Sequence, residues 1–203
     1  MIEVEKKFLL NKEQEKQLIE GAEFIGEKVF TDIYYDAKDY CLTSNDKWLR
    51  SRSGKFELKL PFNKINEVRR GDLYDEIEDE NRIRDIFNVS KDFGMEEGLE
   101  KNGYAKFCTC TTTRRKYKKG IFAIDIDFVD YNDDFTYGLA EIELMVNDES
   151  EMSKAIENII DFAKESGLEV KYVRGKVIEY MKRKLPEHFQ ALVTSGLIKP
   201  EQV

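Results

Sequence analysis

Two neighbouring stretches decide the fold: residues 121–130 read IFAIDIDFVD and residues 136–146 read TYGLAEIELMV. Apolar and polar residues alternate in both stretches, and successive side chains of a β-strand point to opposite faces of the sheet. Asp125 and Asp127 therefore share one face, and the isoleucines beside them share the other. The alternation predicts two β-strands, each with an apolar face and a carboxylate face.

The same two-residue period runs through the first three quarters of the chain. It predicts strands at residues 2–9, 24–36, 46–53, 55–61, 72–79, 104–117, 121–130 and 136–146. Helical periodicity predicts helices at residues 11–21, 80–91, 150–166 and 175–195, the last one broken at Pro186. Asn11 is suited to cap the first helix, and Gly21 and Gly167 stand where helices commonly end. Gly120 is expected to turn a hairpin.

The composition disfavours several classes of protein. Of 203 residues, 41 are acidic and 33 are Lys or Arg, and the net charge of −8 disfavours a general nucleic-acid binder. No apolar run reaches the roughly 18 residues of a transmembrane helix, and the acidic start Met1-Ile-Glu-Val-Glu does not resemble a signal peptide. We therefore expect a cytoplasmic protein of one domain, residues 1–203, without membrane or nucleic-acid partners.

Cysteine and histidine chemistry is disfavoured as well. The three cysteines are too few, and odd in number, for a disulfide framework. Cys108, Cys110 and the lone His188 fall short of a zinc site, so we expect buried thiols there. Carboxylates, lysines and arginines remain as the groups that can carry chemistry.

Eight mostly antiparallel strands with a few helices indicate an α+β fold. We expect a closed eight-stranded β-barrel, a tunnel with a polar, charged lumen and with the helices packed outside. The alternative is an antiparallel sheet with one face on the core and the other in water, where the charged side chains are simply solvated. The distribution of charge favours the tunnel.

Like charges occur in pairs on one strand face, two residues apart or, for Lys55/Lys59, four, and acidic and basic pairs lie on different strands. The pairs are Glu3/Glu5, Asp125/Asp127 and Glu141/Glu143 on acidic strands, and Arg50/Arg52 and Lys55/Lys59 on basic strands. Such neighbours repel by about 4 kcal/mol at roughly 4 Å in an effective dielectric of about 20, unless something neutralises them. This segregation suits a divalent cation on one wall and a phosphate-like anion on the other. Oxygen ligands without His or Cys indicate Mg²⁺, Mn²⁺ or Ca²⁺.

A resemblance to a known family rests on short motifs. Glu3-Val-Glu-Lys-Lys7 resembles the E-x-E-x-K signature of the CYTH proteins, the triphosphate tunnel metalloenzymes. Further matching motifs follow in the family's order: Trp48-Leu-Arg-Ser-Arg52, Phe56-Glu-Leu-Lys59, Tyr74-Asp-Glu76, Thr113-Arg-Arg115, Ile124-Asp-Ile-Asp127, Ala140-Glu-Ile-Glu143 and Gly175-Lys176. The match runs from residue 2 to about residue 185. Within the family, the region from Thr31 to Arg50 looks like the animal thiamine triphosphatases.

The resemblance implies a role for each matching residue. The metal-binding acids are Glu3, Glu5, Asp125, Glu141 and Glu143. The basic residues that hold the triphosphate are Lys7, Arg50, Arg52, Lys59, Arg115 and Lys176. Glu76 matches a tunnel carboxylate and is assigned with Lys59 to catalysis, whereas Glu57 and Asp127 are neighbours without a fixed role. Arg114 and Arg115 point to opposite faces, and the resemblance selects Arg115.

Trp48 bears on the substrate because it shares a strand face with Arg50 and Arg52. We expect an aromatic platform for a thiazolium cation, as in the matching thiamine triphosphatases; the alternative is a tryptophan that covers a loop at the barrel mouth. The resemblance thus implies hydrolysis of thiamine triphosphate to the diphosphate and phosphate with Mg²⁺, or with Mn²⁺ as the alternative. An inorganic triphosphatase, a class IV adenylate cyclase and a non-catalytic polyphosphate-binding module are the other candidates. The sequence does not determine the oligomeric state.

Overall fold

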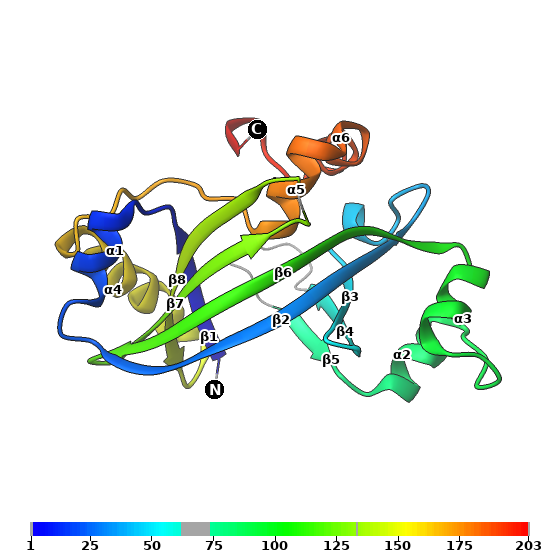
Figure 1. The fold of residues 1–203 in the computed structure, drawn as a ribbon, viewed down its shortest axis with the longest axis horizontal. Helices are drawn as coiled ribbons and strands as arrows, with labels where there is room; N and C mark the ends of the chain where they lie inside the picture. The colour runs from blue at the N-terminus through cyan, green and yellow to red at the C-terminus, as the bar shows by residue number, and fades with distance from the viewer. Residues whose placement is uncertain (1, 62–73, 133, 203) are drawn as a thin grey trace. The chain divides into compact units, whose positions relative to one another are not determined.

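The computed structural model describes residues 2–61, 74–132 and 134–202, and its strands form one eight-stranded sheet (Figure 1). The strands are β1 (Ile2–Phe8), β2 (Glu23–Ala37), β3 (Trp48–Arg52), β4 (Lys55–Pro61), β5 (Tyr74–Ile77), β6 (Tyr104–Lys119), β7 (Phe122–Asp130) and β8 (Thr136–Val146). The α-helices are α1 (Lys12–Ile19), α2 (Glu80–Phe87), α3 (Met95–Lys101), α4 (Met152–Glu165), α5 (Lys176–Lys184) and α6 (Pro186–Thr194). Short 3-10 turns are η1 (Thr43–Asn45), η2 (Glu149–Glu151) and η3 (Pro200–Gln202). The α+β class is confirmed.

All eight predicted strands are present, although residues 72 and 73 of the predicted fifth strand lie outside the described residues. Asn11 caps α1 as expected, because its side chain accepts hydrogen bonds from two backbone N–H groups while Gln14 bonds back to the Asn11 N–H. The last predicted helix divides into α5 and α6, with Pro186 at the start of α6.

Helix α3 is the element that the sequence pattern missed. It has seven residues and contains Gly98, a poor helix former. A Cβ atom at Gly98 would lie 2.3 Å from Cγ1 of Val89, so only glycine lets the helix pack this closely against that valine. Close packing has overridden helix propensity here.

The prediction of a closed barrel is wrong for the hydrogen-bonded sheet. The strand order is β1-β8-β7-β6-β2-β3-β4-β5, so β1 and β5 are edge strands, and no pairing joins them among the described residues. A barrel closes by pairing its two edge strands along their length. Here β1 has seven residues and β5 has only four. The described sheet is therefore open.

The chain forms two compact units, each described by itself below. The β1/β8 unit takes its described residues from 2–29 and 111–175, and the β3/β4 unit takes them from 30–61, 74–110 and 176–202. The long strands β2 and β6 contribute one part to each unit. The prediction of a single domain stays a prediction.

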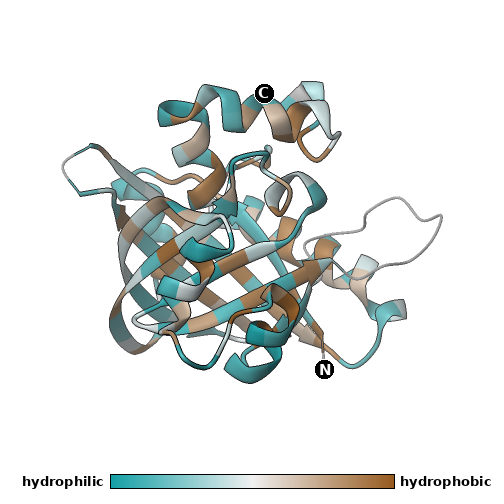
Figure 2. Cartoon of the chain, turned by 90° about the vertical axis from the view of Figure 1, so that its right-hand side faces the viewer, coloured by the Kyte–Doolittle hydropathy of each residue, from teal (hydrophilic) through white to brown (hydrophobic). Residues whose placement is uncertain are grey.

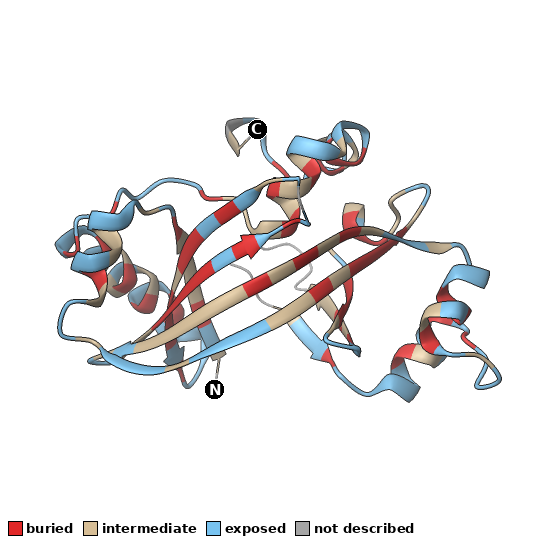
Figure 3. Ribbon diagram, in the orientation of Figure 1, coloured by how far each residue is buried: buried red, intermediate tan, exposed pale blue. Residues whose placement is uncertain are grey.

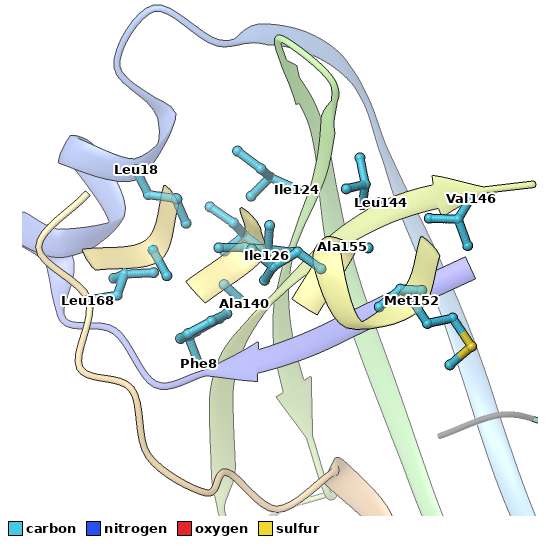
Figure 4. Packing of buried hydrophobic residues seen from close by; sticks show 14 residues of the cluster. Phe8, Leu18, Ile124, Ile126, Ala140, Leu144, Val146, Met152, Ala155 and Leu168 are labelled. Carbon is cyan, nitrogen blue, oxygen red and sulfur yellow. The ribbon is translucent and has the colours of Figure 1, made fainter. Parts of the chain in front are cut away.

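The core of the β1/β8 unit lies between the sheet and two helices. Side chains from β1, β7 and β8 pack against α1 and α4 (Figure 4). Phe8, Leu18, Ile124, Ile142 and Ile159 are fully buried. Burial of each such side chain contributes about 1.5–3 kcal/mol. Figure 3 shows the buried residues as bands along the strands, whereas the outer sides of α1 and α4 are exposed.

The β3/β4 unit has its own core, formed by β3, β4 and β5 with α2 and α3. Leu49, Leu58, Ile83 and Leu99 are at most 1% exposed and belong to one apolar cluster. Hydrophobic and hydrophilic bands alternate along the strands (Figure 2), as the two-residue period predicts. Helices thus cover an apolar sheet face in each unit, and the charged residues lie on the opposite face.

Within the β3/β4 unit, the only histidine of the chain ties the C-terminal helix α6 to η1 and β2. Nε2 of His188 in α6 lies 2.8 Å from Oγ1 of Thr43, whose hydroxyl donates to Asp36 over 2.6 Å. The ring stacks on Tyr40 at 4.2 Å and meets Phe107 edge-on. Among the described residues, no helix is long and apolar enough to cross a membrane.

Candidate active site

In the β1/β8 unit, three neighbouring strands put carboxylates on the face opposite the core. The register places Glu5 opposite Glu143, and Asp125 opposite Glu141. Directly opposed side chains of antiparallel strands have Cβ atoms about 4.5–5.5 Å apart. The register agrees with the strand faces predicted from the alternation.

Carboxylates form two groups of three that share one member. Within each group, the oxygen atoms lie within 4.8 Å of one another. One group is Glu3, Glu5 and Glu143, and the other is Asp125, Glu141 and Glu143. These five residues, called the acidic cluster below, are the ones for which the sequence predicts metal binding. The structure brings them together around the shared Glu143, and their metal-binding role stays a prediction.

The electrostatics of the acidic cluster fit a divalent cation. Burial raises the pKa of Glu143, and the nearby Asp125, Glu3 and Glu141 raise it further, to about 8. Burial also raises the pKa of Asp125, and its Oδ1 atom is buried without a hydrogen-bond partner among the described residues. Surplus negative charge, oxygen donors and an unpaired buried oxygen atom are what Mg²⁺ or Mn²⁺ can satisfy.

Arg114 on β6 is the cation most deeply engaged with these carboxylates. Its guanidinium donates to Asp127 over 2.6 and 2.7 Å, to Asp125 over 2.6 Å and to Glu141 over 2.6 Å. Burial lowers the pKa of Arg114, but the hydrogen bonds and the three carboxylates outweigh it and raise the pKa. Arg114 therefore stays charged and fixes the orientation of two acids of the cluster.

The selection of Arg115 for the charged face is wrong. The register places Arg114 opposite Asp127, whereas Arg115 lies opposite Ile126 and donates over 2.7 Å to Glu15 of α1. Adjacent strand residues point to opposite faces, so only one arginine can face the carboxylates. Arg115 instead anchors α1 to the outer side of the sheet.

Two lysines complete the charged face of the β1/β8 unit. Lys7 forms ion pairs with Glu5 and, over 3.7 Å, with Glu141. Lys116 lies 3.1 Å from Asp125. The acidic cluster and Asp127 thus make six carboxylates, and three cations (Arg114, Lys7 and Lys116) form the ion pairs described with them, so the carboxylates outnumber the cations that pair with them.

The β3/β4 unit carries the basic residues. Arg50 is 9% exposed and donates to Oε2 of Glu57 from two nitrogens, at 2.8 and 2.7 Å. Burial lowers the pKa of Arg50, but the neighbouring Tyr34, Asp32 and Glu57 raise it by more. Arg50 is therefore a permanently charged group with a fixed orientation.

Asp32 on β2 joins two of the predicted phosphate ligands. Its carboxylate is fully buried and accepts hydrogen bonds from Arg52, at 2.7 and 3.1 Å, and from Lys176 at the start of α5. Phe30 lies beneath both cations, at 4.3 Å from the Arg52 guanidinium and 4.9 Å from the Lys176 ammonium. Burial raises the pKa of Asp32, but Arg52 and Lys176 outweigh it and lower the pKa to about 2.

The remaining predicted residues lie around the start of β3 and β5. Lys59 donates to Glu76 over 2.5 Å, and the register places it opposite both Glu76 and Trp48. The indole N–H of Trp48 donates to Asp46 over 2.9 Å. Trp48 is only 8% exposed, so a headgroup can stack on its ring only after neighbouring side chains move.

A family model for the CYTH domain matches residues 1–174 of this chain. The chain belongs to the CYTH family. Among curated proteins, the thiamine-triphosphatase of Macaca fascicularis is 29% identical over 217 residues, which cover 99% of this chain and 94% of that protein. The thiamine-triphosphatase of Homo sapiens is 29% identical over 218 residues, with 100% and 94% covered.

Solved structures share the fold of this chain. The PH1819 protein from Pyrococcus horikoshii OT3 superimposes with a TM-score of 0.65 at 24% identity, covering 90% of this chain and 99% of that one. HpAC1 from Hippeastrum, described as having a dominant triphosphatase activity, superimposes with a TM-score of 0.58 at 19% identity and covers 91% and 96%. At these identities, the two superpositions support the fold alone.

The CYTH match ends before α5, so it does not include Lys176. The ion pair between Lys176 and Asp32, 144 residues apart in sequence, nevertheless places Lys176 beside the same carboxylate as Arg52.

Sequence reasoning missed Asp32, because an isolated aspartate in a strand carries no signal without its partners. It also missed Lys116, although Lys116 shares the strand face of Arg114 by parity.

Proposed function

We propose that this CYTH protein hydrolyses the terminal phosphoanhydride of an organic triphosphate with the help of a divalent cation. The observation that carries the proposal is the segregation of charge between two clusters. One unit gathers five carboxylates whose repulsion a cation relieves, and the other gathers the basic residues Arg50, Arg52, Lys59 and Lys176. Carboxylates for a metal and cations for a phosphate chain are the two parts that phosphoryl transfer needs.

The acidic cluster would hold Mg²⁺, with Mn²⁺ as the alternative. Such an ion, when bound, supplies Lewis-acid stabilisation of the charge on the phosphate oxygens. The protein itself would hold the five carboxylates in place. Arg114 contributes by fixing two of them, Asp125 and Glu141, through hydrogen bonds. Lys7 contributes a further positive charge beside Glu141.

The basic residues would bind the triphosphate chain. Arginine binds phosphate oxygens in a bidentate manner and lysine acts as a point charge, so a mixed set suits a flexible polyanion. Arg50, Arg52, Lys59 and Lys176 each rest on a carboxylate of this unit. On substrate binding, phosphate oxygens would replace part of these contacts, and Glu76 would be released from Lys59 to accept a proton from water.

Thiamine triphosphate is the proposed substrate. Support comes from the two thiamine-triphosphatases at 29% identity and from the position of Trp48 beside Lys59. Inorganic triphosphate is a second candidate, because the low exposure of Trp48 does not offer an open ring face.

A hydrolysis panel tests the proposal. Thiamine triphosphate, inorganic triphosphate and ATP are incubated with Mg²⁺, Mn²⁺ or Ca²⁺, and the products are analysed. We expect release of phosphate from thiamine triphosphate with Mg²⁺. Binding without turnover would instead indicate a polyphosphate-binding module, and cyclic AMP with pyrophosphate would indicate an adenylate cyclase.

The variant W48A tests the choice of substrate. Loss of cation–π stacking, about 0.5–2 kcal/mol, should raise the KM for thiamine triphosphate several-fold and leave that for inorganic triphosphate nearly unchanged. Equal changes for both substrates would remove the support for an organic headgroup and favour inorganic triphosphate.

A further inference from the structure

A side-chain network at the start of β3 is not used by the proposed hydrolysis. Oδ1 of Asp46 accepts two hydrogen bonds, from the indole N–H of Trp48 at 2.9 Å and from the hydroxyl of Tyr74 at 2.8 Å. One carboxylate thus joins the only tryptophan of the chain to the first residue of β5. Both aromatic rings are held by their polar edges.

The backbone holds Asp46 firmly in this position. Its φ of 59° lies in the left-handed region, which aspartate tolerates better than most residues. Its N–H closes η1 by donating to the carbonyl of Thr43 over 3.0 Å. The carboxylate is therefore presented by a fixed turn rather than by a freely moving loop.

A cation already lies beside this network. The ammonium group of Lys59 is 5.8 Å from the centre of the Tyr74 ring, within the range of a cation–π contact. Lys59 is also a residue that the proposed function assigns to the phosphate chain. If phosphate draws Lys59 away, the position beside the Tyr74 ring would be left to another cation.

We infer that Asp46 is the specificity-determining residue that selects a triphosphate whose other end is a cationic heteroaromatic ring. This inference rests on the proposed function and deepens it. Asp46 acts in two ways: it orients Trp48 and Tyr74 through two hydrogen bonds, and its negative charge favours a cationic ring over a neutral one. A neutral nucleobase gains only the first of these.

The fluorescence of Trp48 provides a direct measurement, because the chain has one tryptophan. Thiamine, which carries the cationic ring but no phosphate, is titrated into the protein while Trp48 emission is recorded. A 3-methylthiazolium salt and the corresponding neutral thiazole are titrated in the same way. For the wild-type protein we expect saturable quenching, with the thiazolium bound about tenfold more tightly than the thiazole, which corresponds to about 1.4 kcal/mol.

Substitutions separate the two roles of Asp46. D46N keeps an oxygen that can accept both hydrogen bonds but removes the charge, whereas D46A removes both. D46N should weaken thiamine binding about tenfold and raise the KM for thiamine triphosphate, with little change for inorganic triphosphate. D46A should do the same and also shift the Trp48 emission maximum. D39N is the matched control, because Asp39 is an exposed acceptor for the Cys41 N–H a few residues away.

Each outcome decides the inference. Equal weakening of thiamine triphosphate and inorganic triphosphate by D46N, or no effect of D46N, would overturn it, as would equal affinity of the wild-type protein for thiazolium and thiazole. The wild-type comparison decides the matter even when D46N does not fold. Asp46-dependent binding of thiamine without any hydrolysis would support the inference while rejecting the proposed hydrolysis; hydrolysis of inorganic triphosphate without a response to thiamine would do the reverse.

Discussion

The two units differ in how far their charged side chains are neutralised by ion pairs. In the β3/β4 unit the basic residues that we assign to phosphate are paired at rest: Arg50 with Glu57, Lys59 with Glu76, and both Arg52 and Lys176 with Asp32. In the β1/β8 unit the acidic cluster keeps a surplus of negative charge, and the pKa of Glu143 is raised to about 8. The basic residues are paired within their own unit, whereas the acidic cluster carries a repulsion that a bound cation would relieve.

The largest expected effect follows from loss of a cation ligand. Glu141 belongs to the acidic cluster and also accepts a hydrogen bond from Arg114. E141Q keeps the shape of the side chain and removes its charge, so turnover at ordinary Mg²⁺ should fall on the order of 100-fold or more. Steady-state kinetics at increasing Mg²⁺ measure this effect. An unchanged kcat with unchanged metal dependence would show that the cluster does not bind the catalytic ion.

Two adjacent arginines provide an internally controlled test of the acidic side. R114M removes the shared partner of three carboxylates, of which Asp125 and Asp127 are buried, and breaking a buried ion pair costs about 3–5 kcal/mol. R115M removes a half-exposed pair with Glu15, which is worth about 1 kcal/mol or less. Chemical denaturation of both variants measures the difference. Equal losses of stability would contradict the assignment of Arg114 to the charged face.

Acid titration tests the pairing of the basic side at Asp32. The pKa of Asp32 is lowered from 3.8 to about 2 in the folded chain, so its contribution to stability is present above about pH 4 and is lost as the pH falls towards 2. The contribution is about 2 kcal/mol. D32N should lower the unfolding free energy by this amount at neutral pH, and the difference from the wild-type protein should shrink below pH 4. Denaturation at pH 7 and pH 2.5 measures it.

The smallest expected effect concerns stability without metal. Because the pKa of Glu143 is raised to about 8, this carboxyl ionises at a cost in the folded protein without metal. E143Q removes this cost, so at pH 8 in EDTA the variant should melt a few degrees higher than the wild-type protein, corresponding to about 1 kcal/mol. Mg²⁺ should raise the Tm of the wild-type protein more than that of E143Q. A lower Tm of E143Q in EDTA would show that the acids do not repel one another as described.

Much of this arrangement follows from local sequence patterns. The two-residue period located the strands and assigned Glu5, Asp125, Glu141 and Glu143 to one face, because side-chain direction depends only on position along a strand. The period did not show which of Arg114 and Arg115 lies on the charged face. Residues 111–119 are mostly polar on both faces, so no clear apolar face marks the side that packs on the core.

Other features depend on contacts between distant parts of the chain. The role of Asp32 arises from Lys176, 144 residues away. Closure of the barrel depends on the pairing of edge strands, which periodicity within a strand cannot report. Helix α3 exists because Gly98 packs tightly against Val89, against its own low helix propensity.

The contacts that α5 and α6 make with β2 and η1 have a practical consequence for anyone who shortens this chain. A fragment cut where the family match ends, at residue 174, lacks Lys176 and His188. Without Lys176, Asp32 would keep one counter-charge in place of two. Without His188, the side chains of Asp36 and Thr43 would lose the ring that now contacts them. A minimal version chosen by homology alone would therefore retain the acidic cluster and lose one of the basic residues together with the contacts around it.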